Sequence, residues 1–151
     1  MVFNTTRGEI KFNVYETMGQ EVTLDPFDYM EADCAIVMFD VTRFRTCYNV
    51  QHWSSNVVRA SRKENLRVLI VRNKCDLEDK RQFFQDHFES DLVSPPYMEV
   101  SAMISDWKCV APLECLAQIL LGDDELKFVE GQTYPPPLLP LWFLLQRLMT
   151  V

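Results

Sequence analysis

Three short apolar runs, at residues 35–39, 66–71 and 97–100, constrain the fold of this chain most strongly. Each has the length of a β-strand, and each reads as largely continuous rather than alternating with polar residues. Continuous runs are typical of strands that are covered on both faces, as in a parallel sheet. They therefore predict three strands at the centre of an α/β domain.

Helical patterns alternate with these runs. One apolar stripe recurs at helical spacing before the second run, and a cleaner one follows the third run, between a proline and a glycine that favour helix ends. These stripes consist of Val50, Trp53, Val57 and Ala60, and of Leu113, Leu116, Ala117 and Leu120 between Pro112 and Gly122. A shorter helix is predicted around Phe84, His87 and Phe88. Alternating strands and helices indicate an α/β doubly wound sheet.

The N-terminal residues show a different, alternating pattern. Ile10, Phe12 and Val14 alternate with more polar neighbours, which predicts a strand over residues 10–15 with one face on the core. Residues 2–6 can pair with it as a hairpin that turns at residues 7–9.

Composition bounds the classes of partner. With 151 residues and nearly half of them apolar, the chain is sized for one domain with a core. Its formal net charge of −7 argues against nucleic acid as the main partner. One basic cluster suits a solvated helix face, or else an acidic protein partner; it comprises Arg59, Arg62, Lys63 and Arg67.

Cysteine usage and the N-terminus suggest a cytosolic or nuclear protein. The five cysteines form no C-x2-C pair, and only two histidines accompany them, so we do not expect a zinc site. Scattered cysteines in odd number fit a reducing compartment. The first residues lack the apolar stretch of a signal peptide.

The composition changes after residue 130. Residues 131–137 read as a proline-rich linker, and the apolar tail that starts at residue 138 is too short to span a membrane. We expect a domain over residues 1–130 and a tail that docks on it, binds a partner, or exposes an apolar patch.

The motif Asn73-Lys74-Cys75-Asp76 follows the second apolar run directly. In a doubly wound sheet, ligands bind beyond the carboxyl ends of the strands. A carboxylate there can accept hydrogen bonds from the ring N–H and exocyclic amine of guanine. Asn73 can tie the loop together, and the stem of Lys74 can cover the face of the base. A polar surface loop is the alternative interpretation.

Two further loops follow strands in the matching order. Ser101-Ala102 comes after the run at 97–100, where backbone N–H groups can reach the base. Glu16-Thr17-Met18-Gly19-Gln20 comes after the strand at 10–15, where a loop that senses a γ-phosphate is expected. Together the three loops favour a guanine-nucleotide site over a chance match.

These segments resemble the Ran branch of the small Ras-like GTPases. The resemblance covers about residues 2–130, and its most specific parts are Phe39-Asp40-Val41-Thr42 and Gly122-Asp123. It implies GTP or GDP with magnesium as ligands, transport receptors or Ran-regulator-like proteins as partners, and a role in nucleocytoplasmic transport, hence in nucleus and cytoplasm. By the same resemblance, Gln20 occupies the position that orients the attacking water, Gly19 belongs to the nucleotide site, and Glu16 occupies an indirect magnesium position.

The departures from the family are equally informative. The sequence contains no Gly-x4-Gly-Lys-Ser/Thr loop, because none of its four glycines stands in that arrangement. Glu16, Met18 and Met103 replace residues that the family uses at its site. The resemblance thus implies an N-terminally truncated, divergent member: an incomplete P-loop GTPase-like sheet lacking the first strand, the phosphate loop and the first helix.

The missing first strand would lie in the middle of the family's sheet, so its neighbours need a repair. We expect one of three repairs: the strands at 10–15 and 35–39 pair directly with each other, the apolar tail fills the gap between them, or a partner does. We predict a degenerate GTP-binding or protein-interaction module without hydrolysis. The alternatives are a true Ran-like GTPase whose phosphate-binding part is missing from this chain, and a non-functional remnant.

Overall fold

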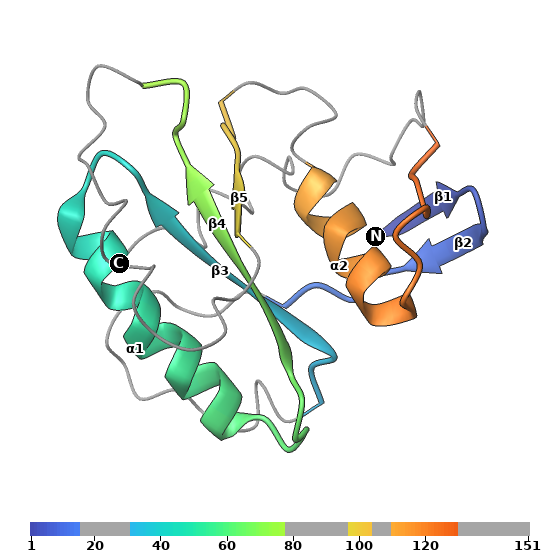
Figure 1. Ribbon diagram of the computed structural model, residues 1–151, viewed down its shortest axis with the longest axis horizontal. Helices are drawn as coiled ribbons and strands as arrows, with labels where there is room; N and C mark the ends of the chain where they lie inside the picture. Colours follow the sequence, from blue (N-terminus) through green and yellow to red (C-terminus); the bar gives the residue numbers. More distant parts are fainter. Residues whose placement is uncertain (16–30, 78–96, 104–109, 130–151) are drawn as a thin grey trace.

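The computed structural model describes residues 1–15, 31–77, 97–103 and 110–129, and these residues form two small sheets and two helices (Figure 1). The predicted helix around residues 84–88, the linker and the apolar tail lie outside these residues. The elements in chain order are β1 (Val2–Thr5), β2 (Gly8–Lys11), β3 (Cys34–Asp40), α1 (Phe44–Ala60), β4 (Arg67–Asn73), β5 (Tyr97–Glu99) and α2 (Ala111–Leu121).

The three apolar runs form one parallel sheet in the order β3-β4-β5. The register pairs Cys34 with Arg67 at one end of β3 and Asp40 with Asn73 at the other. Helix α1 connects β3 to β4, which gives the strand–helix–strand order of an α/β fold. The predicted fold class, a partial P-loop GTPase-like α/β sheet, is confirmed.

Both faces of this sheet are covered, as continuous apolar strands require. On one face, Val37 and Phe39 pack with Cys47 and Val50 of α1. On the other, Met38 packs in a cluster with Leu116 of α2. Alternate residues of β3 thus serve two separate core clusters.

The predicted ends of α2 are confirmed. Pro112 lies in its first turn, where a missing backbone N–H costs nothing. Gly122 ends the helix in the left-handed conformation at φ 64°, and its N–H donates to the carbonyl of Gln118. No helix in the described part of the chain is long and apolar enough to cross a bilayer.

The N-terminal hairpin forms as predicted, but its second strand is shorter than expected. β2 ends at Lys11 rather than at residue 15. The backbone of Phe12 still exchanges two hydrogen bonds with Met1, at 2.7 and 2.6 Å, so β1 supplies partners only this far. An alternating pattern shows which face is buried, but a strand also needs a neighbour to pair with.

Direct closure of the hairpin on β3 was one expected repair, and it is wrong for the described residues. β1 and β2 pair with each other in a separate two-stranded sheet, the other bridge of β1 joins Thr5 to Phe128, and neither strand pairs with β3. Helix α2 lies between this hairpin and the three-stranded sheet (Figure 1). Its Leu116 packs on the large sheet, and its Ala117 packs with Phe3 of β1. Apolar packing on one shared helix therefore replaces strand pairing.

The segment after α2 fastens the hairpin in place. The ring of Phe128 stacks on the ring of Phe3, with centroids 4.5 Å apart. The N–H of Thr6 donates to the carbonyl of Lys127 at 2.9 Å, and Arg7 forms an ion pair with Asp123 at 2.7 Å.

Candidate functional site

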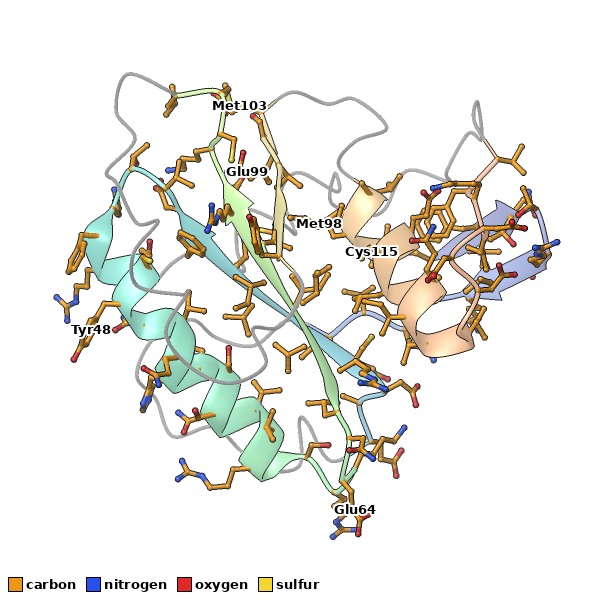
Figure 2. The ribbon with its side chains drawn as sticks, in the orientation of Figure 1. Tyr48, Glu64, Met98, Glu99, Met103 and Cys115 are labelled. Atoms are coloured by element: carbon orange, nitrogen blue, oxygen red, sulfur yellow. The ribbon has the colours of Figure 1, made fainter. Side chains whose placement is uncertain are left out.

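The carboxyl ends of β3 and β4 lie side by side, because Asp40 and Asn73 are paired in the parallel register. Parallel sheets bind ligands at this edge. The motif of residues 73–76 and the Ser101-Ala102 pair both follow strands that end there. Exposed Met103 marks this end of the sheet, and Glu64 marks the opposite end (Figure 2).

Asn73 joins the two loops. It is fully buried at the end of β4, and its side-chain Oδ1 accepts a hydrogen bond of 2.9 Å from the backbone N–H of Ala102. The N–H of Cys75 donates to the carbonyl of Val100 at 3.2 Å, which adds a second tie between the same segments. We expected the Ala102 N–H to face a base, whereas here it bonds within the protein.

Lys74 has a backbone conformation that is uncommon for a residue with a side chain. Its φ is 65°, the one positive φ among the described non-glycine residues. Its ammonium group lies 2.6 Å from the Oδ2 atom of Asp40, while its side chain stays about one third exposed. The loop therefore leaves β4 in a sharp turn that holds the lysine against the end of β3.

Asp76 is exposed to solvent, and its carboxylate accepts a hydrogen bond from the hydroxyl of Ser101. This contact links the two loops a third time, at their exposed side. A carboxylate has about four acceptor positions, so one hydroxyl leaves capacity for further donors. Asp76 can therefore still accept the two N–H groups that guanine presents.

Asp40 is a charged residue at the carboxyl end of β3, an outer strand of the sheet, and its side chain is only 4% exposed. Burial by itself raises the pKa of this carboxyl. Hydrogen bonds from Lys74 and from the hydroxyl and N–H of Thr42 outweigh burial, and the net pKa lies below its usual value. Asp40 is thus charged at neutral pH.

Asp40 was not predicted to be a site residue, although it belongs to the stretch Phe39-Asp40-Val41-Thr42 that carries the resemblance. The sequence did contain a signal for Asp40 as a site residue, because this carboxylate directly follows the apolar run at residues 35–39. Parallel register places such strand ends together.

The predicted phosphate-side residues, Glu16, Gly19 and Gln20, lie outside the described residues. Their roles therefore stay predictions. Among the residues that the structure describes, no group of three or more metal-binding side chains comes together.

A family model described as the Ras family matches residues 2–109, which is most of the chain. The chain belongs to the Ras family. It is therefore a small-GTPase-like protein, of a class that binds guanine nucleotides. The match includes the hairpin, the parallel sheet and both loops of the candidate site. In this Ras-family chain, the edge formed by β3, β4 and β5 is the position at which a guanine base is expected.

Proposed function

We propose that this Ras-family protein is a Ran-type member that binds the guanine base weakly and acts as a protein-interaction module without hydrolysing GTP. The Ran-type assignment is supported by the stretches Phe39-Asp40-Val41-Thr42 and Gly122-Asp123. The first lies at the end of β3, and the second directly follows α2.

The observation that carries the base-binding part is the connection between the two loops. Asn73 bonds to Ala102, Cys75 bonds to Val100, and Ser101 bonds to Asp76. These contacts hold the exposed carboxylate of Asp76 without a ligand. A site that is already formed loses less conformational entropy when it binds.

The absence of hydrolysis is supported by the sequence of this chain. It contains no Gly-x4-Gly-Lys-Ser/Thr loop, which would supply backbone N–H groups and a lysine to the phosphates. Individual hydrogen bonds to a base add only about 0.5–1.5 kcal/mol each. Base contacts alone therefore leave an affinity in the millimolar range, on the order of −4 kcal/mol.

The proposed partners are transport receptors or Ran-regulator-like proteins, and the proposed location is the nucleus and cytoplasm. Support for both comes from the resemblance to the Ran branch. The negative net charge fits a protein partner better than nucleic acid. The apolar segment after residue 137 is proposed to dock on this domain or on a partner.

A second candidate is a Ran-type GTPase whose phosphate-binding part is encoded outside this sequence. The complete set of contacts between the base-side loops favours it, since such contacts are what a working nucleotide site needs. Coding sequence upstream that contains the phosphate loop would decide for this candidate.

Base selectivity tests the proposed function. NMR titration of the folded protein with guanosine should shift the amide signals of residues 73–76 at millimolar concentration, and adenosine should not. Asp76→Asn should weaken guanosine binding at least fivefold. Glu64→Gln, a change at the far end of the sheet, should leave it unchanged (Figure 2). Equal shifts with adenosine and guanosine would contradict base recognition.

A further inference from the structure

Among the residues that the structure describes, Asp40 is a buried anion with one close cation. Its Oδ2 lies 2.6 Å from the ammonium of Lys74, whereas the guanidinium of Arg43 is 3.9 Å away on a largely exposed side chain. Its Oδ1 accepts hydrogen bonds from the N–H and the hydroxyl of Thr42, at 2.8 and 2.6 Å. A buried charge needs such compensation, and Lys74 supplies its opposite charge.

Lys74, the cation that pairs with Asp40, is also the residue of the 73–76 motif with a positive φ. A side-chain-bearing residue at φ 65° is held there by its surroundings, because the conformation costs about 1 kcal/mol or more. Two contacts hold Lys74. Its side-chain ammonium pairs with Asp40, and its backbone carbonyl accepts a hydrogen bond of 3.0 Å from the N–H of Leu77. The residue is thus held at both its side chain and its backbone.

Asp40 also connects the motif to the start of α1. Its backbone N–H donates to the hydroxyl of Thr46 in α1, and the single hydrogen of that hydroxyl lies within reach of the backbone carbonyls of residues 40 and 43. Arg43 provides no side-chain cap for α1, and the N–H of Thr46 donates to the carbonyl of Arg43. The anchor for Lys74 is therefore itself fixed to a helix.

We propose that Asp40 is a positioning residue of the guanine site, which fixes the side chain of Lys74 before a ligand arrives. With its ammonium held by Asp40 and its Cα held by the loop, the aliphatic stem between them loses most of its rotamer freedom. The side chain as a whole is about one third exposed, and its stem can cover one face of a purine. This role rests on the proposed function.

In this arrangement the ammonium of Lys74 is paired with Asp40 and is not available to a phosphate. Because Lys74 is neutralised by Asp40, its contribution to a ligand is the apolar stem and not the charge. Guanosine, which carries no phosphate, is therefore the suitable probe.

The first arm of the test uses the ligand-free protein. In Asp40→Asn, hydrogen exchange at the Leu77 amide should become at least tenfold faster after correction for the change in global stability. Lys74→Met removes the ammonium of the same ion pair while keeping an unbranched side chain, and it should speed Leu77 exchange to the same extent. This variant also provides the test if Asp40→Asn fails to fold. The matched control Thr42→Val removes another contact of Asp40 and should leave Leu77 exchange unchanged.

The second arm measures guanosine affinity by NMR titration. Asp40→Asn should weaken guanosine binding about three- to tenfold, and Thr42→Val less than twofold. Unchanged Leu77 exchange in Asp40→Asn and Lys74→Met would overturn the positioning role. If the unmodified protein binds guanosine and Asp40→Asn binds it equally well, the positioning role is also overturned. If the unmodified protein binds no guanosine, the proposed function fails, and the first arm alone decides whether Asp40 fixes Lys74.

Discussion

The side-chain Oδ1 of Asn73 accepts a 2.9 Å hydrogen bond from the buried backbone N–H of Ala102, which joins the end of β4 to the loop after β5. Asn73 is fully buried, and Ala102 is 5% exposed. The residue that most strongly marks the guanine motif is therefore also part of the internal structure. Its substitution should affect folding as well as binding.

Asn73→Ala should lower the free energy of unfolding by about 2–3 kcal/mol, because it leaves the Ala102 N–H buried without this acceptor. Urea denaturation monitored by circular dichroism measures the loss. Asn56→Ala removes an amide from the surface of α1, where its partners His52 and Arg59 are exposed, and should cost less than about 1 kcal/mol. Equal losses in the two variants would show that the buried contact contributes little.

Asp40 should make the protein sensitive to acid. Its pKa is lower in the folded protein than in the unfolded chain, where it is about 3.9. Its stabilising contribution is therefore complete above that value and is lost as the pH falls through the lowered pKa. Asp40→Asn should cost about 1–3 kcal/mol at pH 7, and it should flatten the dependence of unfolding free energy on pH below about pH 4. An unchanged acid slope in the variant would contradict this role.

Cys47 should make the protein sensitive to alkali. Burial on the face of α1 that packs on β3 raises the pKa of its thiol to about 11. The unfolded thiol ionises at lower pH, so the stabilising difference is complete below about pH 9 and is lost as the pH rises toward 11. Unfolding free energy should fall by about 1–2 kcal/mol over this range, and by less in Cys47→Ala. Titration of stability against pH, with both proteins equally reduced, measures the difference.

Phe128→Ala should loosen the attachment of the hairpin. The ring is 8% exposed and stacks on the fully buried ring of Phe3. Removing it should cost about 3–4 kcal/mol, a large part of the stability of a small domain. Tyr48→Ala, at a side chain of α1 that is 74% exposed, is the control and should change stability by less than about 1 kcal/mol (Figure 2). A Phe128→Ala cost as small as that of the control would show that the hairpin is held by its backbone contacts.

Much of the fold was predictable from apolar patterns. The three runs became β3, β4 and β5, and the helix between Pro112 and Gly122 has the predicted ends. These features depend on local sequence, namely on alternation, on helix-end residues and on continuous apolar stretches. Local signals cannot show which strands pair. The separation of the hairpin from β3 depends on packing between Phe3, α2 and Phe128, which are far apart in the chain.

The candidate site was also predictable only where it depends on local sequence. Asn73, Lys74 and Asp76 form a contiguous motif, and Ser101 was expected to lie near them because it follows a strand of the same sheet. The ion pair between Lys74 and Asp40 joins residues on neighbouring strands and was missed. Its geometry depends on the positive φ of Lys74, which no sequence pattern in this chain indicates.

The proposed function gives this Ras-family chain a guanine-binding edge but no working phosphate site. Calorimetric titration with GTP and GDP, with and without magnesium, on protein shown by circular dichroism to be folded is the decisive measurement. We expect no magnesium-dependent binding at micromolar concentration. Tight, magnesium-dependent binding of GTP that Asp76→Asn abolishes would contradict the proposed function.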